Sequence, residues 1–161
     1  MQTFWKLAPW LTRLILLVPI LLFARIGLPH VFHPVETLAV RGISFSSGFG
    51  VTSARIGFGA FPLGLSLFLL GCLLSERRLL IGLSLVATMD AVLLVVRIFG
   101  MMADASVQEN MRLVDAELIL LIVMGVAIFL ELSRRAGIRK TQEGAWREPG
   151  VRPAGQSSLY A

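Results

Sequence analysis

The stretch from Ile56 to Leu74 contains no charged residue and has about the length that an apolar helix needs to cross a bilayer, roughly 20 residues. Three other apolar stretches, at about residues 10–31, 79–101 and 112–132, have similar lengths. The hydrophobic content of 56% and the mean hydropathy of +0.80 exceed what soluble domains usually show. The sequence therefore predicts an all-α integral membrane protein.

The spacing of the four stretches predicts how they pack. The second stretch, 52–74, is joined to the third by only a short turn, which makes the two an antiparallel pair. We expect residues 1–140 to form a four-helix bundle, up-down-up-down, followed by a polar, disordered cytoplasmic tail at 141–161. The long connection from Pro29 to Val51 has room for a short strand or a re-entrant stretch around Val40–Phe45, and its sequence has no periodicity that decides between the two. Small residues predict two packing faces on the second helix. One is a stripe of Gly57, Ala60, Gly64 and Gly71, and the other lies on the Arg55 side with Gly59, Pro62 and Ser66.

The first apolar stretch is the most ambiguous of the four. Its charge-free part, Leu14–Ala24, is short, so a spanning helix must include Arg13 and Arg25 and extend their side chains toward the surface. The alternative is a cleaved signal peptide with Lys6 and Arg13 as its basic region. Arg25 directly after Ala24 makes a poor cleavage site, which favours a retained helix.

Basic residues near the ends of the stretches predict the orientation. One side carries Lys6, Arg13, Arg77, Arg78, Arg134, Arg135, Arg139 and Lys140, and the other carries mainly Arg41 and Arg112. Both termini are therefore expected in the cytoplasm. The excess of arginine over lysine suggests a GC-rich bacterial genome and hence a bacterial inner membrane. The basic residues flank apolar stretches, so we do not expect nucleic acid as a partner; the expected surroundings are the lipid bilayer, with a second copy or a membrane partner protein as further options.

Charged residues inside the apolar stretches mark the candidate site, because charges at membrane depth are costly and need partners. They are Arg25, Arg55, Asp90, Arg97, Asp115 and Glu117. With a rise of 1.5 Å per residue, five of them lie about 7 to 12 Å outward of the helix centres, and Asp90 lies at the midplane. We expect Arg97 and Arg55 to reach Glu117, and Asp90 either to pair with Arg25 or to carry a proton.

Two interpretations of this charged layer are open. It is either a polar binding site near the outer face or an ion-pair clamp that fixes how the helices align. The first favours a binding or accessory membrane protein. The alternative function is a small proton-coupled transporter or carrier that uses Asp90. An enzyme is the less favoured class, because the sequence contains no nucleophile–base pair and no phosphate-binding or HExxH motif.

Metal and cofactor sites have little support in the sequence. A helical turn could bring His30, His33 and Glu36 onto one face as metal ligands. Pro29 and Pro34 disfavour a regular helix in this segment, however. We therefore expect no metal and no cofactor. The single cysteine, Cys72, excludes an intramolecular disulfide and fits a small packing residue.

Three segments resemble a bacterial membrane family called domain of unknown function 4345. The stretch TSARIGFGAFPLGLSLFLLG resembles its second helix, in which an arginine, here Arg55, precedes a glycine-rich apolar run. The stretch RIFGMMADAS resembles its R-x-x-G…D-G pattern, with Ala105 in place of the last glycine. The stretch VDAELILL matches the acidic position of its last helix at Glu117.

The resemblance covers roughly residues 10–132. It implies four membrane helices and supports Arg55, Arg97 and Glu117 as site residues. It implies no reaction.

Overall fold

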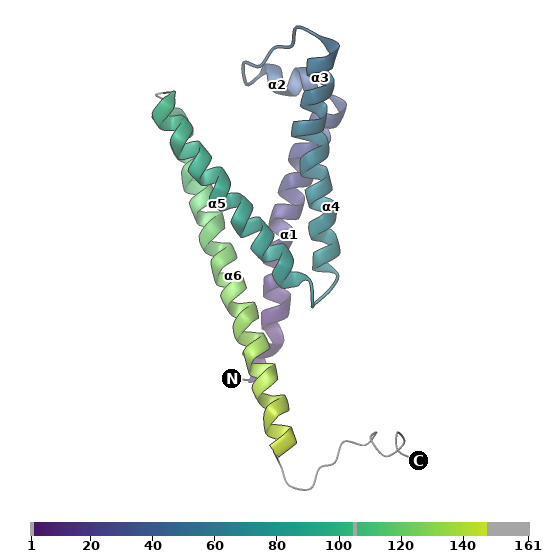
Figure 1. Cartoon of the computed structure of the whole chain (residues 1–161), viewed down its shortest axis with the longest axis vertical. Helices are drawn as coiled ribbons and strands as arrows, with labels where there is room; N and C mark the ends of the chain where they lie inside the picture. Colours follow the sequence, from purple (N-terminus) through teal and green to yellow (C-terminus); the bar gives the residue numbers. More distant parts are fainter. Residues whose placement is uncertain (1, 105, 148–161) are drawn as a thin grey trace, which may run out of the picture.

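The computed structural model describes residues 2–104 and 106–147, and it confirms an all-α helical bundle (Figure 1). The described residues contain no strand. Four helical segments are long and apolar enough to cross a membrane: Pro9–Phe32, Gly48–Leu73, Leu79–Ala103 and Asn110–Arg139. They run alternately up and down along the chain. The protein is thus a multi-pass helical membrane protein.

Several helices extend beyond the apolar stretches from which they were predicted. Helix α1 spans Gln2–Phe32 and helix α6 spans Val107–Arg147, whereas hydropathy predicts 10–31 and 112–132. Hydropathy marks only the part of a helix that crosses the membrane, and polar residues such as Lys, Arg, Gln and Glu continue a helix well. Residues 141–147, expected as part of a disordered tail, are therefore helical, while residues 148–161 lie outside the described part.

The connection after α1 contains a short helix and no strand among the described residues. Helix α1 ends at Phe32, just before His33–Pro34, because the residue before a proline disfavours helical geometry. Helix α2 (Pro34–Ala39) starts with that proline at its first position. The chain then turns through Gly42, which has a φ of 76°. The segment Val40–Phe45, where the sequence leaves a strand or a re-entrant stretch open, is turn and loop.

The second membrane-crossing segment is a continuous helix with a wide turn. Helix α3 (Gly48–Ala54) starts before the predicted residue 52, since the Ser47 hydroxyl caps it by accepting a hydrogen bond from the Gly50 N–H at 3.3 Å. A π-helical turn, η1 (Arg55–Ala60), then leads into α4 (Phe61–Leu73). A π-helix bonds each residue to one five positions away. Ala54 and Gly59, five residues apart, are accordingly both buried.

Glycine lets α1 and η1 approach closely. A Cβ added to Gly27 would lie 2.8 Å from the backbone oxygen of Gly59, and one added to Gly59 would lie 2.9 Å from the Val31 nitrogen. The predicted small-residue stripe faces elsewhere. Gly57, Ala60, Gly64 and Gly71 are exposed, and a Cβ added to any of its three glycines would meet no atom of the described chain within 4 Å. The expectation that this stripe forms a packing face within the bundle is therefore wrong, because the neighbouring helix lies on the Gly59 side.

Two apolar cores divide the bundle along its length. The larger combines residues from α1, α4, α5 (Leu79–Ala103) and α6, among them Leu16, Leu69, Leu83 and Met124. We call this end, which includes the turn between α4 and α5, the closed half. The smaller core joins α5 and α6 only, through Leu94, Met101 and Val114. We call this end, which also carries α2 and α3, the open half.

The helices form two pairs that separate in the open half. Helix α1 packs on η1 and α4, and α5 packs on α6. Figure 1 shows the two pairs close together at the α4–α5 turn and diverging toward α2 and α3. Charged residues at one depth but on different pairs are therefore kept apart, and this determines which predicted contacts form.

Candidate functional site

Arg97 and Glu117 form the central ion pair of the open half. Nε of Arg97 lies 2.9 Å from each carboxylate oxygen of Glu117, and Nη2 lies 2.6 Å from Oε1. Their side chains are 26% and 14% exposed. This is a bidentate ion pair, in which two parallel hydrogen bonds are strengthened by the opposite charges of the guanidinium and the carboxylate. The predicted contact between Arg97 and Glu117 is confirmed, and it joins α5 to α6.

The start of α6 occupies the remaining side of Arg97. Nη1 of Arg97 donates to the Oδ1 of Asn110 at 3.2 Å. The Asn110 amide donates in turn to the backbone oxygen of Ser106 at 3.0 Å and to its hydroxyl at 3.2 Å. Arg97 thus has partners on each of its three nitrogens. Asn110 is absent from the residues predicted for the site, although its position seven residues before Glu117 on the same helix face was an available signal.

Asp90 is a buried acidic residue of α5 that has no arginine paired with it among the described residues. It is only 5% exposed, and its Oδ2 has no hydrogen-bond partner in the described chain. It lies on the buried face of α5 between Val86 of the larger core and Leu94 of the smaller one. Asp90 therefore marks the level at which the four-helix core gives way to two separate pairs.

The proposed partner of Asp90 does not reach it. Arg25 is exposed and makes no ion pair with any described residue, so the expected Asp90–Arg25 pair is wrong. The buried hydroxyl of Ser66 on α4 is not a partner either, because it donates its hydrogen bond to the Ile20 backbone oxygen at 2.9 Å. The remaining alternative, a proton on Asp90, stays a prediction.

Two further members of the predicted charged layer stay outside the cluster. Arg55 is exposed and has no ion pair among the described residues, so its expected contact with Glu117 is wrong. It lies on η1, in the α1–α4 pair, whereas Glu117 belongs to the diverging α5–α6 pair. Asp115 is exposed as well, two residues from Glu117 and on another side of α6. A shared depth does not bring side chains together when the helices separate.

The three metal-ligand candidates are not brought together. His30 is buried beside Phe58, and its Nδ1 lies 2.7 Å from the backbone oxygen of Ile26. His33 and Glu36 are exposed, with 3.6 Å between Nδ1 and Oε2. Across residues 2–104 and 106–147, no three His, Cys, Asp or Glu side chains are grouped so as to hold a metal ion.

A second polar cluster lies in the closed half, around Glu131. Its side chain is 0% exposed and accepts hydrogen bonds from Arg134 at 2.8 and 2.9 Å and from Arg135 at 2.8 Å. Arg135 also donates to the backbone oxygens of Glu76 and Arg77 at 3.0 and 3.2 Å. The cluster therefore ties α6 to the α4–α5 turn. Arg134 and Arg135 enter the prediction from sequence only as charges that indicate orientation. Their positions three and four residues after Glu131 were a signal that they pair with it on one helix face.

Comparison with known proteins found no relative. No protein-family model matches the chain, and no curated protein or solved structure matches it either.

Proposed function

We propose that this chain is a binding or accessory protein of a bacterial cytoplasmic membrane, and that its ligand occupies the open half beside Asp90 and the Arg97–Glu117 pair. The excess of basic residues at the closed end supports an orientation with both termini in the cytoplasm. We also propose membership of the domain of unknown function 4345 family, on the three segments that resemble it.

Asp90 is the observation that carries this proposal. Burying a carboxyl group without a hydrogen-bond partner is unfavourable, and such residues within membrane helices are commonly functional. Glu131, which is buried, and Glu117, which is half-buried, are both paired with arginines. One oxygen of Asp90 has no partner in the described part of the chain, and the residue lies between Val86 of the larger core and Leu94 of the smaller one.

The chemistry of the free groups indicates the type of ligand. Since Arg97 already has partners on all three nitrogens, the unused hydrogen-bonding capacity lies on the oxygen of Asp90. A ligand that suits it supplies a hydroxyl or amine donor and an apolar body that replaces lipid between the helix pairs. A polar side chain of a partner membrane helix would supply the same donor in an accessory role.

A carbodiimide tests whether this site admits a molecule from the membrane. Dicyclohexylcarbodiimide is apolar and modifies carboxyl groups that carry a proton. In lipid vesicles we expect mass spectrometry to find the adduct on Asp90, and not on Glu117, whose carboxylate oxygens are bonded by Arg97. The Asp90→Asn variant is the negative control, and Asp115→Asn is the matched control that keeps the adduct. A folded protein with no adduct on Asp90 would contradict an open site.

The second candidate function, proton-coupled transport, rests on the same residue. A carboxyl group at the midplane that gains and loses a proton is the usual element of a proton relay. The protein is placed in vesicles that contain a pH-sensitive dye, and a gradient of substrate or of pH is imposed across the membrane. If the chain transports protons, the internal pH should change with the intact protein and stay constant with the Asp90→Asn variant. If both chains leave the internal pH equally unchanged, the binding role is the one to retain.

A further inference from the structure

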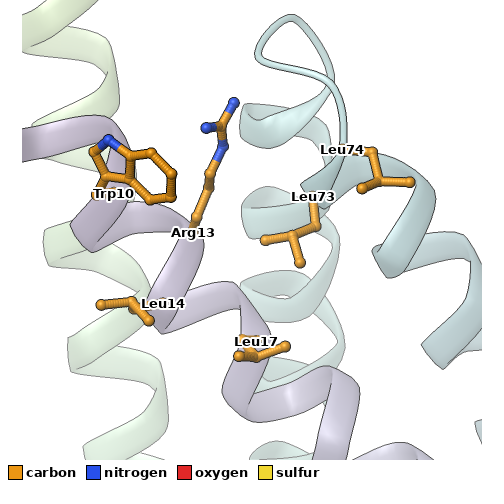
Figure 2. A pocket seen from close by; sticks show the side chains of 6 residues that line it. All are labelled: Trp10, Arg13, Leu14, Leu17, Leu73 and Leu74. Atoms are coloured by element: carbon orange, nitrogen blue, oxygen red, sulfur yellow. The ribbon is translucent and has the colours of Figure 1, made fainter.

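A groove in the closed half lies far from Asp90 and has no role in the proposed function. It has a volume of about 350 Å³ and is lined by Trp10, Arg13, Leu14, Leu17, Leu73 and Leu74. Figure 2 shows Arg13 reaching from α1 toward the α4–α5 turn, with Leu14 and Leu17 further along α1. The groove therefore has one cationic end and an apolar remainder.

Arg13 has unused capacity to bind an anion. Its Nε is buried and has no hydrogen-bond partner in the described chain. Its Nη2 makes only a long contact, 3.5 Å, with the Oε1 of Glu76, whose side chain is 60% exposed. An exposed pair of this kind contributes little and exchanges easily for a better acceptor. Phosphate oxygens bind the adjacent Nε and Nη nitrogens of a guanidinium in parallel.

The surroundings of Arg13 match the headgroup level of a membrane. The Trp10 ring lies 5.6 Å from the Arg13 guanidinium carbon, and tryptophan is enriched at that level. Arg77 and Arg78, in the adjoining turn, are exposed and add positive charge. The leucines extend from this level toward the membrane interior, along the spans that start at Pro9 and end at Leu73.

We propose that this groove binds an anionic phospholipid, with the lipid phosphate on Arg13 and one acyl chain along Leu14, Leu17 and Leu73. A free phosphate ion would leave the apolar walls uncovered, and a zwitterionic lipid would gain less from the net positive charge around the groove. A phospholipid with a net negative charge satisfies both ends of the groove at once.

Fluorescence of Trp10 tests this proposal. Replacing Trp5 and Trp146 with Phe leaves Trp10 as the single tryptophan of the three in the chain. The protein is placed in phosphatidylcholine vesicles, and brominated phosphatidylglycerol or brominated phosphatidylcholine is added as quencher. We expect the phosphatidylglycerol to bind about fivefold more tightly at Trp10, the effect of one arginine near a membrane surface.

Three variants distinguish a specific lipid site at Arg13 from a general attraction of anionic lipid to the positively charged end of the protein. Arg13→Gln should bring the preference for phosphatidylglycerol close to one, whereas Arg139→Gln, which removes an exposed charge of α6 at the same end of the bundle, should leave it unchanged. Leu14→Phe, at an exposed position, should lower the preference by obstructing the groove while Arg13 stays, and it serves if Arg13→Gln does not fold. Inorganic phosphate at millimolar concentration should not compete.

Four outcomes would overturn the proposal. The preference persists in both Arg13→Gln and Leu14→Phe; it falls equally in Arg139→Gln; inorganic phosphate abolishes it, which indicates a free-anion site; or neither lipid quenches Trp10, which indicates that protein covers the groove.

Discussion

The closed and open halves of this bundle are built from the same four helices but held together differently. In the closed half, all four helices contribute to one core around Leu16, Leu83 and Met124. In the open half, the helices are held only as pairs, by Leu94 and its neighbours between α5 and α6 and by a glycine contact between α1 and η1. Lipid solvates apolar side chains as well as a protein core does, so exposed apolar surface does not force the pairs together.

The buried acids differ between the halves in the same way. Glu131, in the closed half, is fully buried and bonded by two arginines. In the open half, Glu117 is bonded by Arg97, but Asp90 is left without a partner on one oxygen. The comparison teaches that the buried acid of the closed half is fully paired with arginines, whereas the open half contains a buried acid with hydrogen-bonding capacity left over.

The largest loss of stability is expected when the hydrogen-bonded cluster around Glu131 is broken. Glu131→Gln removes the charge that Arg134 and Arg135 share, and removing one member of a buried ion pair typically costs about 3 kcal/mol. Unfolding in mixed micelles of a mild detergent and dodecyl sulfate measures the loss. Glu76→Gln, at an exposed acid on the same side, is the control and should change stability little. Equal losses in the two variants would contradict a closed half held by this cluster.

A smaller loss is expected at the glycine contact of the open half. In Gly27→Ala the new methyl group would meet the Gly59 backbone oxygen and Leu63, and overpacking of this kind costs about 1–3 kcal/mol. Gly64→Ala is the matched control, because its new methyl group meets open space. The same unfolding assay should show a loss only for Gly27→Ala. A loss of similar size in Gly64→Ala would show that the exposed glycine stripe is covered by protein after all.

The Arg97–Glu117 pair should contribute less to stability than the Glu131 cluster or the glycine contact. Side-chain hydrogen bonds between membrane helices contribute about 1 kcal/mol or less. Glu117→Gln should lower the free energy of unfolding by that amount, and adding Arg97→Gln should restore part of it by removing the unpaired cation. Purely additive losses in the double variant would mean that the two side chains do not interact.

The smallest effect is expected for the exposed arginines of the α1–α4 pair. Arg25→Gln and Arg55→Gln should each change stability by less than about 0.5 kcal/mol, as exposed substitutions usually do. A loss at Arg55 that matches the loss at Glu117, and disappears in the Glu117→Gln background, would show that the pairs close and that Arg55 reaches Glu117.

Hydropathy and depth predicted part of this structure well. The four membrane-crossing segments follow from the apolar stretches, because crossing a bilayer requires them. The Arg97–Glu117 contact follows from opposite charges at one depth on helices that are consecutive in the chain.

The remaining contacts depend on which way each side chain points around its helix axis and on how each helix is tilted. The depth of a residue in the membrane determines neither of these. The π-helical turn from Arg55 to Ala60 alters which residues face α1, and the divergence of the pairs separates Arg55 from Glu117. The packing glycines, Gly27 and Gly59, could not be told from the exposed stripe by composition, because the difference lies in where the neighbouring helix sits.

Helix α6 gives the two halves a mechanical connection. Its 41 residues make a rod of about 60 Å, roughly twice the thickness of the hydrocarbon layer, so a sizeable part projects into water. Arg135 attaches this helix to the α4–α5 turn at a point nearer its C-terminal end than its N-terminal end. A tilt of α6 about this attachment that moves the N-terminal end by a few ångströms would therefore move the C-terminal end in the opposite direction by a smaller distance.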